Sequence, residues 1–231
     1  YMYLFLWLLS LTIRFLAELD SYQMSWPGPE VGRHAAVCVR VSMFAISSGV
    51  LVGCMHFLDR LCRIMVMMVD AFCFYCAHSS VAVDTLVDDW NILQALLRHT
   101  AGTCEASILL LLATVSAALV TAILGPMQAV TAEPRTFWVL AILGPLVLLS
   151  GCVLMKAAQV TEKCKRVPSV ANSMIFRFQM GDRFYLTHYI SWSNAGFYVR
   201  EVLINGIMVL KVGHLGFLAV FAVLSRLLAT G

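Results

Sequence analysis

The fold is decided by one uninterrupted stretch, residues 34–79, which reads HAAVCVRVSMFAISSGVLVGCMHFLDRLCRIMVMMVDAFCFYCAHS. It contains no Pro, and its only Gly residues are Gly49 and Gly53. A helix of this length would run ~70 Å, whereas the hydrocarbon layer of a membrane is only ~30 Å thick. A polar cluster midway along the stretch marks the point at which we expect the helix to leave the lipid: His56, Asp59, Arg60 and Arg63.

Further hydrophobic segments lie on both sides of this stretch, and each is long enough to cross a bilayer, which takes roughly 20 residues. The five predicted membrane segments cover about residues 1–19, 34–57, 107–124, 137–155 and 195–228. Helix-breaking residues lie between several of them, at Trp26-Pro27-Gly28-Pro29, Gly125-Pro126 and Glu133-Pro134. The chain is 61% hydrophobic and 13% charged, which is too apolar a composition for a water-soluble domain of 231 residues.

The sequence therefore predicts an all-α fold, a polytopic membrane helical bundle with long helices that extend into the cytoplasm. Residues 1–33 would form a first transmembrane segment and an external loop, and residues 34–231 a four-span bundle with cytoplasmic helical extensions. The third helix is expected to begin in water near Asp84 and to enter lipid near Ser107. The chain begins at Tyr1 inside an apolar run, which favours a fragment or a processed form.

The distribution of Lys and Arg predicts the orientation, because cytoplasmic loops carry an excess of these residues. The external side would hold Arg33, Arg135 and Arg226. The cytoplasmic side would hold the larger set: Arg60, Arg63, Arg98, Lys156, Lys163, Lys165, Arg166, Arg177 and Arg183. The C-terminus is then extracellular.

No pattern in the sequence indicates an enzyme, a metal site, a cofactor or a nucleic-acid partner. The chain has no Gly-x-Ser-x-Gly elbow, no His-Glu-x-x-His and no Gly-rich phosphate loop. The pair Cys73 and Cys76 has metal-like spacing, but no second pair is near in sequence, so packing is the preferred interpretation. No basic patch carries interleaved aromatics, as a nucleic-acid interface would.

The last predicted helix carries the candidate functional residues. Ionisable residues at membrane depth usually face a bundle interior or a water path. At ~100° per residue, Glu201 and Asn205 lie ~40° apart, and Lys211 and His214 lie ~60° apart on a neighbouring face. Gly206 and Gly213 lie on the other side, where small residues favour close helix packing. The four polar residues line a pore or cavity, or they form a buried structural contact; both interpretations stay open.

Four features in order resemble the second half of the insect gustatory and odorant receptor superfamily. They are the long helix 34–79, the sequence from Trp90 to His99 ahead of the third span, the polar stretch that follows the fourth segment, and Ala195-Gly196-Phe197-Tyr198 followed by Glu201. The last of these is similar to the Gly-Phe-Phe and acid pattern at the entry to the family's seventh helix. The resemblance covers roughly residues 34–216, with His99, Gly196, Phe197 and Tyr198 as the motif residues. It implies that residues 1–19 are the third span of a longer protein.

This resemblance implies a ligand-gated ion channel subunit in the plasma membrane of a eukaryote. Family members have seven transmembrane helices and assemble as tetramers whose seventh helices line the pore, so we expect membrane lipid, other copies of the chain and an unidentified small molecule as partners. The chain departs from the family where Thr-Tyr and Gln-Phe are usual, since it has Gly213-His214-Leu215-Gly216-Phe217 there. A Lys at pore depth would oppose cations. The alternative is a non-conducting structural or accessory subunit of a larger membrane complex.

Overall fold

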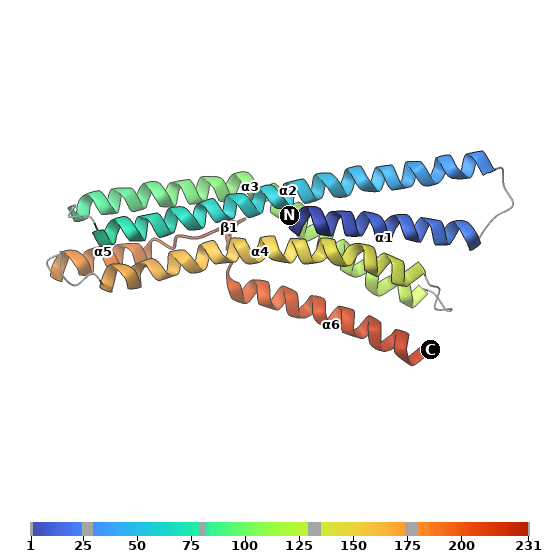
Figure 1. Ribbon diagram of the computed structural model, residues 1–231. Helices are drawn as coiled ribbons and strands as arrows, with labels where there is room; N and C mark the ends of the chain where they lie inside the picture. The colour runs from blue at the N-terminus through green and yellow to red at the C-terminus, as the bar shows by residue number, and fades with distance from the viewer. Residues whose placement is uncertain (1, 25–29, 79–81, 129–134, 174–179, 231) are drawn as a thin grey trace. The chain divides into compact units, whose positions relative to one another are not determined.

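The computed structural model describes residues 2–24, 30–78, 82–128, 135–173 and 180–230. This described part is mostly helical, in agreement with the predicted all-α class (Figure 1). Its elements are α1 (Met2–Met24), α2 (Glu30–His78), α3 (Val83–Gln128), α4 (Arg135–Ser173), α5 (Met180–Trp192), β1 (Tyr198–Val199), β2 (Val202–Leu203) and α6 (Gly206–Thr230).

Residues 34–78 belong to a single helix, because α2 has 49 residues and contains all of them. The third helix begins at Val83 with Asp84 in its first turn, where the helix dipole favours an acid. It continues through Gly125-Pro126 to Gln128, so the break expected there was wrong. A Pro this close to a helix end interrupts only the last turn, which limits its cost. The other expected breaks, 26–29 and 133–134, lie outside the described residues.

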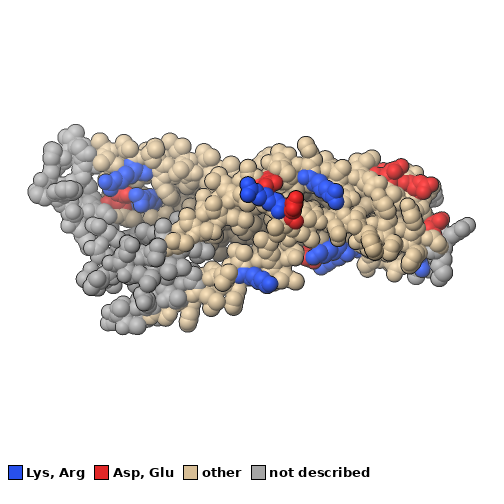
Figure 2. Space-filling model, turned by 180° about the vertical axis from the view of Figure 1, so that it is seen from behind, with Lys and Arg blue, Asp and Glu red and all other residues tan. Residues whose placement is uncertain are grey.

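Among the residues that the structure describes, four helical segments are long and apolar enough to cross a membrane: Met2–Leu19, His34–His78, Val83–Ala117 and Gly144–Ser173. This statement rests on length and composition, and it makes the chain compatible with an integral membrane protein. The fifth expected segment is shorter within the described side chains, where the apolar part of α6 is Gly206–Leu218. On the face drawn in Figure 2, charged side chains form small separate patches on a largely uncharged surface.

The chain divides by its contacts into two compact units. The first unit contains residues 1–57, 111–152 and 212–231, and the second contains residues 58–110 and 153–211. The boundaries between the two units fall within α2, α3, α4 and α6. They differ from the boundary at residue 33 that hydropathy predicts. Most of the charged residues of the chain belong to the second unit.

The second unit is built on buried side chains that recur every three or four residues along three helices. This spacing places them on one stripe of each helix, as in a coiled coil. We call these residues the seam: Leu58, Cys62, Met65, Val69, Phe72 and Cys76 on α2; Leu86, Trp90, Leu93, Leu97, Ala101, Cys104 and Ile108 on α3; Val153, Ala157, Val160, Cys164, Val167 and Ala171 on α4. The cysteines of the seam are free thiols, and they behave here as small apolar residues.

Polar contacts add to the seam at its edges. Lys163 on α4 donates to Asp70 on α2 at 2.7 Å. The hydroxyl of Tyr189 on α5 donates to the side-chain oxygen of Asn91 on α3 at 2.7 Å. The buried carboxylate of Asp59 accepts from Arg63 one turn further along α2 at 2.9 Å. The first two contacts connect α2 to α4 and α5 to α3, and the third lies within α2.

The first unit joins α1 to the first half of α2. The indole Nε1 of Trp7 donates to the Ser48 hydroxyl at 3.0 Å, and the same ring lies against Gly49. Nearer the end of α1, the buried carboxylate of Glu18 pairs with Arg14 on its own helix. Its other oxygen lies 3.7 Å from Arg40 on α2. One acid therefore has a basic partner on each of the two helices.

The seam predicts a sharp contrast between two neighbouring leucines on α3. Leu97 is 2% exposed, whereas Leu96 is 41% exposed. Leu97→Ala should lower the free energy of unfolding by about 2–5 kcal/mol, because it leaves a cavity in the core. Leu96→Ala removes the same atoms and should cost less than about 1 kcal/mol. Thermal unfolding of the purified protein in detergent measures both, and equal shifts would contradict the assignment of the seam as the core.

Candidate functional site

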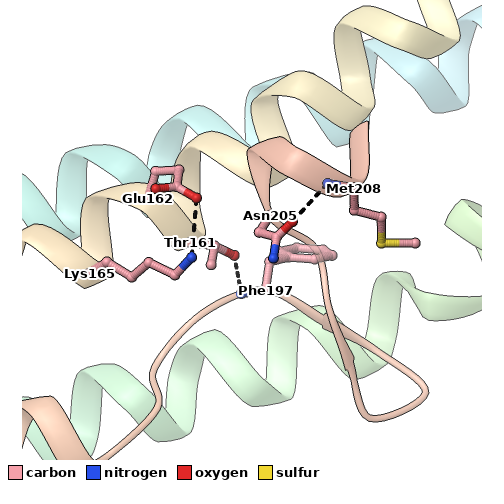
Figure 3. Close-up of polar contacts among 6 residues, drawn as sticks. All are labelled: Thr161, Glu162, Lys165, Phe197, Asn205 and Met208. Atoms are coloured by element: carbon pink, nitrogen blue, oxygen red, sulfur yellow. Dashed lines mark hydrogen bonds and ion pairs between the residues drawn. The ribbon is translucent and has the colours of Figure 1, made fainter. Parts of the chain in front are cut away.

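The last helix does not begin where the sequence predicted. The expectation of one helix across residues 195–228 was wrong, since α6 starts at Gly206 and the residues before it form a turn and a hairpin. Asn205 is the cause: its side-chain oxygen accepts the backbone N–H of Met208 at 2.8 Å (Figure 3). This is the N-cap position, where Asn is among the preferred residues. Glu201 and Asn205 therefore do not share a helical face with Lys211 and His214.

Residues 193–205 connect α5 to α6, and we call them the junction. Within it β1 and β2 pair antiparallel, with Tyr198 opposite Leu203 and Val199 opposite Val202. The two residues that link the strands, Arg200 and Glu201, have positive φ angles of 45° and 64°. Such two-residue turns favour Gly and Asn. For other residues the left-handed conformation costs roughly 1–2 kcal/mol each, so surrounding contacts must hold the turn.

The strongest of these contacts is made to a buried hydroxyl on α4. Thr161 is fully buried, and its Oγ1 accepts the backbone N–H of Phe197 at 3.1 Å (Figure 3). The carbonyl of Phe197 accepts the N–H of Ile204 at 2.9 Å, which brings the two ends of the hairpin together. A Cβ added to Gly196 would lie 2.5 Å from Leu203 Cδ1 and 3.2 Å from Thr161 Cγ2. The segment can approach α4 this closely because residue 196 has no side chain.

The start of the junction is fastened to α3. The Trp90 indole donates to the Ser193 hydroxyl at 2.8 Å, and the Gln94 amide donates to the Ser193 carbonyl at 2.5 Å. The Tyr198 hydroxyl donates to the carbonyl of Asn194 at 2.6 Å. The two bonds to Ser193 satisfy partly buried polar groups, which would be costly to leave without a partner.

The turn of the hairpin has a second contact with α3. Arg200 Nε lies 3.4 Å from Glu105 Oε1, and the Arg200 side chain is largely exposed. Exposed pairs of this kind contribute about 0–1 kcal/mol. The pair therefore orients the turn more than it stabilises it.

The structure brings three of the motif residues together and leaves the fourth elsewhere. Gly196, Phe197 and Tyr198 all belong to the junction, and each has a contact there that depends on its identity. His99 lies on the exposed face of α3. It is one turn from Thr103, whose hydroxyl donates to the His99 carbonyl.

The remaining candidates lie on α6. Lys211 and His214 are both exposed and stay ~60° apart around the helix. A Cβ built on Gly206 or Gly213 would meet no atom of the described residues within 4 Å, so neither glycine packs against the described part of this chain. Large apolar side chains of α6 are exposed as well: Ile207, Leu210, Leu215, Phe217, Leu218 and Phe221.

Sequence reasoning missed Thr161 and the role of Asn205. An Asn followed by Gly206 ahead of an apolar run is a helix-start signal that could have placed the N-cap. Nothing local distinguishes Thr161, because its importance depends on a backbone group that arrives from 36 residues further on. The Arg14 and Glu18 pair was also missed, although its i,i+4 spacing in an apolar segment indicates it.

The polar side chains of the junction hold its backbone in place. The side chains of Ser193, Tyr198 and Asn205 are used in hydrogen bonds to backbone or neighbouring side chains. Within the described ranges, no group of three His, Cys, Asp or Glu residues could hold a metal ion. The junction fixes where α6 begins.

The close approach at Gly196 predicts a specific sensitivity. Gly196→Ala should destabilise the protein by about 1–3 kcal/mol, because the added methyl overpacks the space beside Thr161. Gly206→Ala is the matched control and should have little effect, since space around it is open. Adding Leu203→Ala to Gly196→Ala should recover part of the loss by removing the closest atom. Melting temperatures of the variants test this, and a Gly196→Ala protein as stable as wild type would refute the packing argument.

Neither models of known protein families nor curated proteins match this chain. The geometry of the junction and of α6 is therefore the basis for inferring what the protein does.

Proposed function

We propose that the chain is a subunit of a chemoreceptor-like ligand-gated ion channel in which α6 lines the pore. The proposal rests on the exposure of the large apolar residues of α6. This 25-residue helix leaves a tightly held junction, yet its large apolar residues are exposed in the single chain. Two ionisable residues, Lys211 and His214, lie among them. Lipid or other copies of α6 would cover the apolar part, and water in a pore would solvate the ionisable part.

A second exposed surface supports assembly of several copies. Phe184, His188 and Trp192 follow one another at four-residue intervals along α5. The rings of Phe184 and His188 stack at 5.8 Å, and those of His188 and Trp192 lie tilted at 5.3 Å. Phe184 is 72% exposed and Trp192 is 75% exposed. Exposed aromatic stripes of this kind are typical of protein interfaces. We propose that other copies of the chain cover this stripe, and the receptor resemblance favours four copies.

The proposed channel works through the junction. A ligand that shifts the second unit would move the start of α6, because Thr161 and Asn205 fix that start. Gly196, Phe197 and Tyr198 would transmit the shift. Lys211 would then set ion selectivity, since a positive ring repels cations.

Selectivity gives the direct test of this proposal. Lys211→Glu should move the reversal potential toward that of cations in a planar bilayer that contains the reconstituted full chain, because it reverses the sign of the charge along the pore. Lys163→Glu is the control with the same charge change, at a residue that pairs with Asp70 away from α6. It should leave selectivity unchanged.

Thiol labelling provides a second readout on the same helix. Cys placed at Lys211 or His214 should react with a small aqueous thiol reagent, and Cys at Val209, on the opposite face, should be protected. Protection of all three, together with no current from well-folded protein, would refute the pore and favour the non-conducting accessory subunit.

The orientation is part of the same proposal. We place the loop near Lys163–Arg183 in the cytoplasm of a eukaryotic cell at the plasma membrane, with the C-terminus outside, because Lys and Arg concentrate near that loop. A glycosylation acceptor engineered near Glu133 should be modified when the chain is made in microsomes, and one engineered between Arg166 and Arg183 should not. The reverse pattern would overturn the orientation.

A further inference from the structure

The second unit contains a cavity of about 260 Å³ beside the junction. Residues from α3, α4, α5, the junction and its strand β2 line it together. Pockets for drug-sized ligands have volumes of about 300–1,000 Å³, so this cavity suits a somewhat smaller molecule. Its place matters because three of its lining residues, Asn194, Ala195 and Leu203, belong to the junction that leads into α6.

The charge of the lining favours an anion. Lys165 lines the cavity, and none of the described lining residues is acidic. Lys165 Nζ lies 3.3 Å from Glu162, with both side chains nearly half exposed. Such a pair contributes little, so the ammonium group can turn to a ligand at small cost. Thr161 and Lys165 are four residues apart, which places both on the face of α4 that meets the junction (Figure 3).

The other walls favour an apolar body. Pro168, Ala195 and Leu203 contribute partly exposed apolar surface, and the buried side chains of Trp90 and Ile190 complete the lining. The indole nitrogen of Trp90 is used by Ser193. Asn194 also lines the cavity and adds a neutral polar residue. Apolar surface combined with a few polar groups is typical of small-molecule sites.

We propose that this cavity binds a small amphipathic organic acid, with its anionic group on Lys165 and its apolar body against Trp90, Ile190 and Leu203. Occupancy would fill the space behind Ala195 and Leu203 and so stabilise one position of the junction. The proposal goes beyond the channel function, because binding at this site does not require the protein to conduct ions.

The test compares an acid with its uncharged counterpart. Binding of 3-phenylpropanoate and of 3-phenylpropanamide is measured by calorimetry on the full chain in lipid nanodiscs, with empty nanodiscs subtracted. The acid should bind at least about ten-fold more tightly than the amide, as expected for a charge-assisted contact. Lys165→Gln should reduce the affinity for the acid to that for the amide and leave the amide unchanged. Lys163→Gln, the neighbouring lysine that pairs with Asp70, should change neither affinity.

A steric variant tests the location. Ala195→Leu should weaken both ligands by filling the cavity, and its melting temperature shows whether the fold is kept. Lys165→Gln changes a half-exposed residue, so it tests the site even if Ala195→Leu unfolds the protein. Equal affinities for acid and amide, no binding of either, or an unchanged acid affinity in Lys165→Gln would each overturn the proposal. None of these results would bear on ion conduction, which the Lys211 variants test separately.

Discussion

The hydrogen bond from the Phe197 N–H to the Thr161 hydroxyl is the contact on which the start of α6 depends. Both partners are buried, so the backbone N–H has to find an acceptor inside the protein. Thr161 supplies it only because Gly196 lets the chain pass close to α4. From that point the hairpin returns to Ile204, and the Asn205 cap starts the helix. The turn at Arg200 and Glu201 can keep an unfavourable conformation because both strands are held in this way.

Trp90 joins the core of the second unit to this contact. Its ring lies 5.2 Å from the Phe72 ring within the seam, its nitrogen holds Ser193, and its surface forms part of the cavity wall. A change in seam packing near Trp90 would therefore reach the junction through one rigid side chain. Coupling of this kind needs no separate pathway, because core, junction and cavity share the residue.

The sequence was sufficient for the long helices and insufficient for the junction, for physical reasons. The absence of Pro and the apolar composition of residues 34–78 predict one long helix, and α2 follows that prediction. The start of α3 at Val83 agrees with the acid of its first turn, Asp84. Residues 197–204 contain no Pro or Gly, so a helical-wheel argument extended through them. Their aromatic and β-branched residues, Phe197, Tyr198, Val199 and Val202, favour strands instead. Only the buried hydroxyl from α4 decides between the two, and that contact is not local.

Glu18 on α1 affects how α2 would insert into a membrane after it. If α1 and α2 cross a membrane, α1 enters it first, and Glu18 is already neutralised by Arg14 on the same helix. Arg40 emerges later on α2 without a partner on its own helix in the described residues. Arg40 lies near the end of the predicted span 34–57, so its insertion would cost less than the ~2.5–3.5 kcal/mol of an Arg at mid-membrane. The second oxygen of Glu18 would lower that cost further only for an α2 that pairs with α1, so the earlier helix would favour this neighbour during insertion.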